Sequence, residues 1–257
     1  MFKRVFPFLL VACFAGALCA ADDPFVGEWK LNPSKSKLYD QMKVASVRGN
    51  EYAFNLGSGD ETIVIDGTDQ PGHGGTTLSV AVQGFDSWKV VRKRDGRILL
   101  TAIWTLSENG NALTDDFTSI APNGSTYNVK YLYKRTAAGT GFVGTWVSTT
   151  QTVTSVVVIK IQPRETDGLS FIDTSREETR NVKFDGRDYP KVGPNVVPGS
   201  TCSLRRLNDR TLEMTDKIDG KVIYTQQIEL SPDFKTLTMT RRIAGQSEPN
   251  VRVFDRQ

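Results

Sequence analysis

The sequence predicts an all-β protein made of two tandem antiparallel, up-and-down β-barrel modules. Three observations predict it: apolar and polar residues alternate with a period of two, Gly-containing turn dipeptides separate these stretches, and several segments recur in the same order in both halves. Period-two alternation is typical of strands with one face in water. Closing an up-and-down sheet into a barrel leaves no unpaired edge. A two-sheet β-sandwich is the alternative architecture.

The internal repeat is clearest at the start of each half. Residues 25–29 (Phe-Val-Gly-Glu-Trp) recur as residues 142–146 (Phe-Val-Gly-Thr-Trp). The motif Asp-Gly-x-Asp-x-Pro at residues 66–71 recurs at residues 185–190. Further matches follow in the same order at slightly drifting offsets, as expected when small insertions accumulate in loops.

The repeat sets the predicted domain boundaries. The first module is expected at residues 22–135 and the second at residues 142–257. Residues 136–141 between them are small, which predicts a flexible linker.

Strands and turns follow each other closely along both modules. Alternation is clearest in residues 52–56, 98–106, 127–133, 157–161 and 237–239. Asp-Gly and Asn-Gly dipeptides separate such stretches, and both favour hairpin turns because their residues tolerate positive φ. The spacing predicts about eight strands per module. One short helix is expected at residues 33–38, with Asn32 as its cap.

The N-terminus has the three parts of a secretory signal peptide. Lys3 and Arg4 precede an uncharged apolar run, which ends in small residues at Ala20 and Ala21. This pattern predicts a signal peptide at residues 1–21, cleaved near Ala20 or Ala21, and a secreted or periplasmic protein. The alternative is a lipoprotein anchored at Cys13. No later segment is apolar enough to span a membrane.

Composition excludes several classes of function. The chain has 32 Lys and Arg against 29 Asp and Glu, so it lacks the basic excess typical of nucleic-acid binding. After removal of the signal peptide, Cys202 is the only cysteine, which excludes an internal disulfide and is expected to be buried.

The sequence predicts no catalytic triad, no metal site and no cofactor. His73 is the only histidine and lies in a Gly-rich stretch, which favours a surface loop. Zinc sites need several His or Cys ligands. The repeated Asp66 and Asp185 are interpreted as turn residues. An enzyme that uses two carboxylates alone stays open, because such an enzyme needs no sequence motif.

The Gly-x-Trp motif at each module start, together with an Arg at each module end, resembles the lipocalin (calycin-type) family. The motif residues are Gly27, Trp29 and Arg135 in the first module and Gly144, Trp146 and Arg256 in the second. The opening of the first module also resembles secreted bacterial proteins described as lipocalin-like. The resemblance implies that an Arg lies across the Trp ring at the barrel base, with Trp29 against Arg135 and Trp146 against Arg256.

The interior of a small barrel is either filled by side chains or hollow enough for a ligand. The aromatic residues expected to line a hollow first module are Tyr52, Phe54, Trp88 and Trp104. The leading hypothesis is an exported, non-catalytic protein that binds a small apolar ligand in the first module. The alternatives are surface recognition of an envelope protein or glycan, and a carboxylate-dependent hydrolase.

Overall fold

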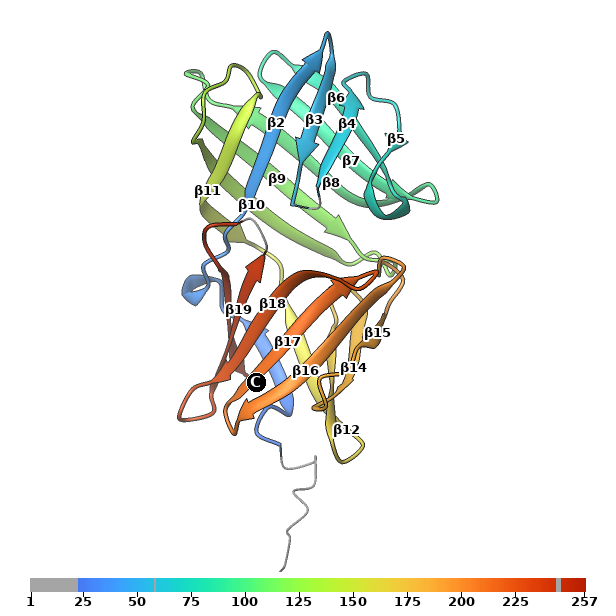
Figure 1. Ribbon diagram of the computed structural model, residues 1–257. Helices are drawn as coiled ribbons and strands as arrows, with labels where there is room; N and C mark the ends of the chain where they lie inside the picture. Colours follow the sequence, from blue (N-terminus) through green and yellow to red (C-terminus); the bar gives the residue numbers. More distant parts are fainter. Residues whose placement is uncertain (1–22, 58, 244–245) are drawn as a thin grey trace, which may run out of the picture.

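The computed structural model describes residues 23–57, 59–243 and 246–257. The expected signal peptide and the alternative anchor at Cys13 lie outside these residues. The described chain forms two ten-stranded antiparallel sheets, of which one is a closed barrel and the other is nearly closed (Figure 1). The predicted all-β, two-barrel fold class is therefore confirmed. Within the described residues, no helix has the length and apolar character needed to cross a membrane.

The N-terminal barrel is the nearly closed sheet. Its strands are β2 (Gln41–Arg48), β3 (Glu51–Asn55), β4 (Asp60–Val64), β5 (Gln70–Pro71), β6 (Thr77–Gly84), β7 (Ser87–Arg94), β8 (Arg97–Leu106), β9 (Ala112–Ile120), β10 (Thr126–Arg135) and β11 (Gly144–Val153). The gap between β4 and β5 is bridged by a side chain. The Val64 amide donates to Gln70 Oε1 at 2.9 Å, and Gln70 Nε2 donates to the Val64 carbonyl at 2.8 Å. The Gln70 amide thus replaces a missing pair of ladder bonds.

The C-terminal barrel is fully closed. Its strands are β1 (Gly27–Leu31), β12 (Val158–Arg164), β13 (Gly168–Asp173), β14 (Glu178–Lys183), β15 (Tyr189–Val192), β16 (Ser200–Asn208), β17 (Thr211–Ile218), β18 (Lys221–Leu230), β19 (Thr236–Ile243) and β20 (Asn250–Arg256). Each barrel thus has more strands than the eight or so that turn spacing predicts. The short β5 and β15 leave too brief an alternating pattern to be recognised.

The two modules exchange their first strands. β1 belongs to the first module by sequence, yet it pairs with β12 and β20 of the C-terminal barrel. β11 belongs to the second module and pairs with β10 and β2 of the N-terminal barrel. The predicted modules 22–135 and 142–257 therefore do not each close their own barrel. Both strands carry the same Gly-x-Trp pattern, so each of them can fill the equivalent position in the other barrel.

The predicted linker is corrected by this exchange. Residues 136–141 form the loop between β10 and β11, inside one barrel, where Arg135 Nη2 donates to the Gly141 carbonyl at 2.6 Å. The chain crosses between barrels at residues 32–40 and 154–157. The first crossing contains a short 3₁₀ helix, Pro33–Lys35, which is shorter than the helix predicted there. Its predicted cap is confirmed, because the Asn32 side chain accepts from the Lys35 amide at 3.3 Å.

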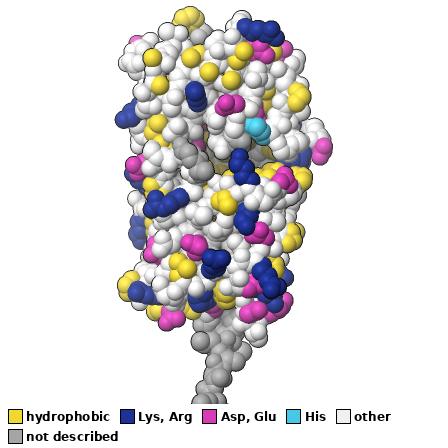
Figure 2. Space-filling model, viewed as in Figure 1, with side chains coloured by type: hydrophobic (Ala, Val, Ile, Leu, Met, Phe, Trp, Pro, Cys, Tyr) yellow, Lys and Arg dark blue, Asp and Glu magenta, His cyan; other side chains and the backbone are white. Residues whose placement is uncertain are grey.

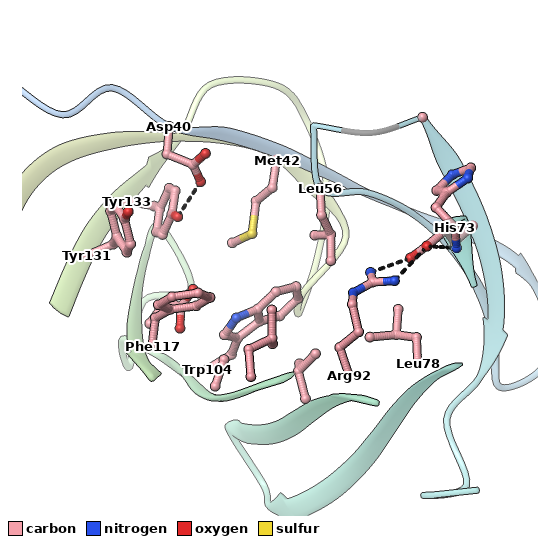
Figure 3. Close-up of a pocket in the computed structure, with 16 residues that line it drawn as sticks. Asp40, Met42, Leu56, His73, Leu78, Arg92, Trp104, Phe117, Tyr131 and Tyr133 are labelled. Atoms are coloured by element: carbon pink, nitrogen blue, oxygen red, sulfur yellow. Dashed lines mark hydrogen bonds and ion pairs between the residues drawn. The ribbon is translucent and has the colours of Figure 1, made fainter. Parts of the chain in front are cut away.

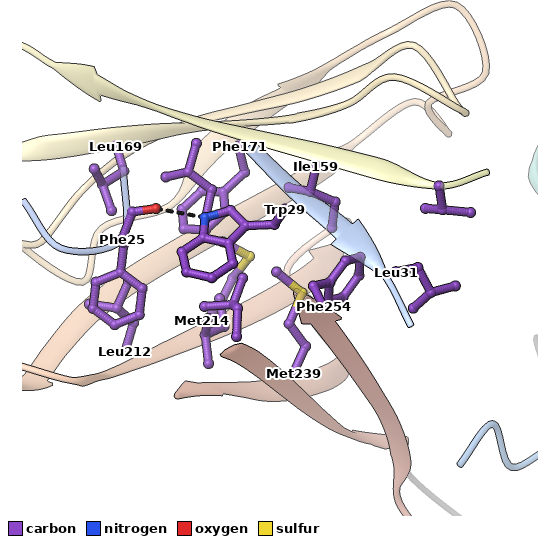
Figure 4. Close-up of a cluster of buried hydrophobic side chains, with 14 of the residues drawn as sticks. Phe25, Trp29, Leu31, Ile159, Leu169, Phe171, Leu212, Met214, Met239 and Phe254 are labelled. Atoms are coloured by element: carbon purple, nitrogen blue, oxygen red, sulfur yellow. Dashed lines mark hydrogen bonds between the residues drawn. The ribbon is translucent and has the colours of Figure 1, made fainter. Parts of the chain in front are cut away.

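An Arg does lie across each Trp ring, as predicted, but each Trp has the Arg that was predicted for the other one. Arg256 Cζ lies 4.1 Å from the ring centroid of Trp29, and Arg135 Cζ lies 4.3 Å from that of Trp146. Both Trp residues are fully buried, and each indole N–H donates at 2.9 Å to the carbonyl of the Phe four residues earlier. Figure 4 shows Trp29 among the apolar side chains of the C-terminal barrel.

The barrels stack with their open ends facing each other. Each closed end contains the buried Trp of a Gly-x-Trp strand, Trp29 in β1 or Trp146 in β11. Loops at the facing ends are joined by hydrogen bonds: Arg97 Nη2 donates to Asn195 Oδ1 at 2.5 Å, and the Asn123 amide donates to Glu177 Oε1 at 3.2 Å. These loops therefore hold the two barrels together at the waist of the molecule.

Candidate functional site

The N-terminal barrel is hollow, whereas the C-terminal barrel is filled. The cavity in the N-terminal barrel has a volume of about 330 Å³, and the corresponding space in the C-terminal barrel has about 20 Å³. The apolar part of the cavity wall comes from strands on all sides of the barrel: Met42, Leu56, Leu78, Val90, Leu100, Ala102 and Phe117 (Figure 3). Such a wall suits the apolar body of a small molecule.

One side of the cavity carries a carboxylate and two tyrosines. Asp40 lies in the first crossing segment, next to β2, and accepts a hydrogen bond of 2.6 Å from the Tyr133 hydroxyl. Tyr131 lies two residues earlier on β10, and its ring centroid is 5.7 Å from that of Tyr133. Burial raises the pKa of Asp40 despite the hydrogen bond from Tyr133. Burial, together with nearby Asp40, also raises the pKa of both tyrosines, which keeps them protonated donors.

A second carboxyl group, Asp115 on β9, lies in the same part of the wall. Its side chain is buried, and Trp104 faces it from β8 at the paired position of the sheet. Asp115 Oδ1 and Trp104 Nε1 are both buried without a hydrogen-bond partner among the described residues. Burial, and then the neighbouring Asp40, raise the pKa of Asp115 to about 8. Near neutral pH the group is therefore mostly uncharged and has unused hydrogen-bonding capacity.

The opposite side of the cavity holds a compensated ion pair. Arg92 Nη1 and Nη2 donate to the two carboxylate oxygens of Glu61 at 2.9 and 2.7 Å. The His73 amide donates to Glu61 at 2.5 Å, and Arg92 also donates to Thr76 Oγ1 at 2.8 Å. Burial opposes ionisation of Glu61, but the hydrogen bonds from Arg92 and His73 outweigh it and lower its pKa. This pair therefore carries no net charge toward the cavity.

His73, expected in a surface loop, lies in a 3₁₀ turn at the edge of this cavity. Its side chain is exposed, and in Figure 2 it is found beside a hollow on the visible face. The same face shows Lys, Arg, Asp and Glu interspersed, as the nearly balanced composition predicts.

Of the four aromatic residues predicted to line the cavity, only Trp104 does so. Trp88 stacks on Phe142 with ring centroids 3.9 Å apart and closes the base of the barrel. Tyr52 meets the ring of Trp88 edge-on at 5.3 Å, and Phe54 lies 6.2 Å from Trp88. The structure thus brings the four together, but three of them form the packed end of the barrel. They pack there because the exchanged strand β11 brings Phe142 and Trp146 into this base.

The sequence reasoning missed the polar side of the cavity. A usable signal existed on β9, where Leu113, Asp115 and Phe117 alternate on one face of the strand. An acidic residue that takes the place of an apolar one in the alternating pattern points into the barrel, and a buried acid is a candidate for function. Asp40 carries no such signal, because it lies in a crossing segment whose position depends on the strand exchange.

The C-terminal barrel fills the equivalent space with longer side chains. The offset of 124 residues that relates Leu113 to Leu237 (237 − 113) places Met239 at the position of Asp115. On the neighbouring strand, the residue paired with Asp115 is Tyr131, and the residue paired with Met239 is Arg252. Four arginines line the small remaining space: Arg176, Arg180, Arg241 and Arg252. Arginine therefore occupies in the C-terminal barrel the volume that is empty in the N-terminal one.

The compensated ion pair is also present in the C-terminal barrel, but with its charges exchanged. Glu61 corresponds to Arg180 at the offset of 119 residues that relates Asp66 to Asp185 (185 − 66), and Arg92 corresponds to Asp216 at the offset of 124. Arg180 Nε lies 3.4 Å from Asp216 Oδ1. The two barrels have therefore diverged most inside their open ends, while their closed ends keep the same Trp and Arg arrangement.

The other residues that the sequence singled out have structural roles. Asp66 accepts from the Thr68 amide at 2.8 Å and Asp185 from the Arg187 amide at 3.0 Å, which is the turn geometry expected for both. Cys202 is fully buried, and burial raises the pKa of its thiol to about 12. No cluster of three or more metal-ligating side chains occurs among the described residues.

No family model, no curated protein and no solved structure matches this chain. The site itself therefore carries the functional argument.

Proposed function

We propose that this protein is an exported, non-catalytic binding protein that holds one small amphipathic molecule inside its N-terminal barrel. The proposal of export depends on the signal-peptide pattern of residues 1–21. The proposal of binding depends on one observation, the contrast between a cavity of about 330 Å³ in one barrel and about 20 Å³ in its diverged copy. An unfilled cavity in one of two related barrels lowers the stability of the fold, and a bound ligand would explain why the cavity is there.

The cavity has the composition of a small-molecule site. Its volume lies at the lower end of the range for such sites, about 300–1,000 Å³, and an apolar wall surrounds a few convergent polar groups. The packed C-terminal barrel then serves as the cover for the open end of the hollow one, since their facing loops are hydrogen-bonded.

The first test is native mass spectrometry of the protein from residue 22 onward, exported into a bacterial periplasm and purified without detergent. We expect a co-purifying adduct that is released on denaturation. Binding is then measured directly with a neutral fluorescent dye, using Ala102→Leu, which narrows the cavity from its wall. Ala112→Leu is the matched control, because Ala112 does not line the cavity. Equal dye affinity in wild type and Ala102→Leu would contradict the proposal.

A carboxylate-dependent hydrolase is the second candidate, since Asp40 and Asp115 share one cavity and both have raised pKa values. It predicts turnover of chromogenic glycosides that Asp115→Asn abolishes.

Surface recognition has less support. The exposed ring of Phe85 has no counterpart in the second module, where the offset of 124 residues leads to Asp209. Repeated exposed aromatic residues would favour surface recognition.

A further inference from the structure

The cavity contains a carboxyl group that lacks a partner. Asp115 is 6% exposed, and its Oδ1 has no hydrogen-bond partner among the described residues. Trp104, which also lines the cavity, is 2% exposed, and no described residue accepts from its Nε1 with hydrogen-bond geometry. A buried polar atom without a partner is unfavourable, and a ligand group that donates to it at this position would remove that cost.

Acidic residues outnumber basic ones in the described part of the cavity wall. Asp40 and Asp115 lie on the same side, where Asp40 contributes to the raised pKa of Asp115. Among the described residues, Arg92 is the only Lys or Arg in the wall, and Glu61 neutralises it by accepting two hydrogen bonds of 2.9 and 2.7 Å. No Lys or Arg in the described part of the cavity wall is therefore left to compensate Asp40 and Asp115. The field in this part of the cavity opposes a second anion and favours a cation.

The rings beside the aspartates add to this preference. Tyr131, Tyr133, Phe117 and Trp104 all contribute to the cavity wall, and Figure 3 shows the two tyrosines beside Asp40 with Phe117 and Trp104 farther along the wall. Aromatic faces attract an ammonium group, and most strongly when both are removed from water. The Trp104 N–H also lies near enough to Asp115 to favour its ionised form. Carboxylates surrounded by aromatic rings form a site for an organic cation.

We propose that the ligand of this cavity is a small amphipathic amine, with its ammonium group between Asp115 and Asp40 and its apolar part against Met42, Leu78 and Val90. This inference depends on the proposed binding function and specifies the ligand class. It excludes fatty acids and other anionic amphiphiles, whose carboxylate would lie beside two buried acids. The ammonium would donate to Asp115 Oδ1, the acceptor that lacks a partner.

The test compares three probes that share one alkyl chain and differ in the head group: octylamine, octanol and octanoate. Each is titrated by calorimetry into the protein from residue 22 onward near neutral pH, and a neutral fluorescent dye reports whether the cavity binds at all. We expect octylamine to bind at least tenfold more tightly than octanol, and octanoate to bind most weakly. Asp115→Asn is expected to remove the preference for the amine while the dye still binds.

The control is Asp116→Asn, because Asp116 is exposed and pairs with Lys130 outside the cavity. Asp40→Asn is the second variant, so that a folding defect in one variant does not decide the outcome. If the dye and octanol bind but octylamine has no advantage, the amine proposal is overturned and the binding function stands. If neither the dye nor any of the three probes binds, both proposals are overturned.

Discussion

The guanidinium of Arg256, at the end of the last strand, lies 4.1 Å over the ring of Trp29, in the first strand. Arg256 also donates to three backbone carbonyls, those of Phe234, Val26 and Pro24, at 2.8, 2.8 and 2.5 Å. One side chain thus joins the two ends of the described chain and seals the base of the C-terminal barrel.

Arg256→Ala is expected to lower the free energy of unfolding by about 2–3 kcal/mol. It removes a cation–π contact and leaves two partly buried carbonyls, those of Val26 and Pro24, without this donor. Urea denaturation followed by fluorescence measures the loss. Arg48→Ala is the control, with a change below about 0.5 kcal/mol, because Arg48 pairs with Glu51 at 85% side-chain exposure. Equal losses of stability in the two variants would show that the contacts of Arg256 at the barrel base do not stabilise the protein.

Cleavage of the chain at residues 136–141 is expected to leave one compact particle. β1 remains paired with β12 and β20, and β11 with β10 and β2, so each fragment contributes a strand to the other fragment's barrel. A protease site inserted between Ala137 and Ala138 permits the cut, and gel filtration measures the outcome. The fragments should separate only in denaturant. Separation in native buffer would contradict the strand exchange.

Asp115→Asn is expected to change how stability depends on pH. The native pKa of Asp115, about 8, lies above its value of roughly 3.9 in the unfolded chain, so the unfolded state loses the proton first. The wild-type protein therefore loses stability from this group as pH rises from about 4 to 8. Asn does not titrate, and the variant should gain on the order of 4 kcal/mol over wild type between pH 5 and pH 8.

Chemical denaturation at a series of pH values measures this difference. The charged or titratable groups that surround Asp115 are Asp40, Asp116, Tyr131, Tyr133 and, across the cavity, Glu61, Arg92 and His73. Asp116→Asn controls for the exposed neighbour. Parallel pH profiles for wild type and Asp115→Asn would mean that Asp115 is not held in its uncharged form.

Trp88→Ala is expected to destabilise the protein by about 3–5 kcal/mol, because it removes a large buried side chain stacked on Phe142. Trp88→Phe should cost less. Ligand affinity per folded molecule should change little in Trp88→Phe, since Trp88 does not line the cavity. Parallel dye titrations of Trp88→Phe and Trp104→Phe check this, and a larger loss in the former would restore Trp88 as a binding residue.

Cys202 is expected to resist thiol reagents in the native protein. Its side chain is fully buried, and burial raises its pKa to about 12, which leaves little of the reactive thiolate. The chain from residue 22 onward carries this thiol alone. Ellman's reagent should react with it only after unfolding by guanidinium. Rapid reaction in native buffer would indicate that the C-terminal barrel opens.

The strand pattern was predictable because it is local. Alternation of apolar and polar residues determines which face of a strand is buried, and the turn dipeptides determine where the strand ends. The cap at Asn32 and the turns at Asp66 and Asp185 are local in the same sense, and the structure has all three.

The cavity was predictable only in part. The first module was favoured as the binding copy for its aromatic residues, but three of these, Tyr52, Phe54 and Trp88, pack the base of the barrel instead. Whether a barrel is hollow depends on the summed volume of inward side chains from all ten strands. A single strand does not reveal that sum.

The two repeats, the all-β class and the Gly-x-Trp and Arg residues that seal each barrel follow from the sequence alone. Which Arg meets which Trp depends on the tertiary fold. The two Gly-x-Trp strands are locally equivalent, so nothing in either strand specifies the barrel that it completes. The choice depends on where the crossing segments 32–40 and 154–157 lead the chain, and the same choice places Asp40 beside Asp115.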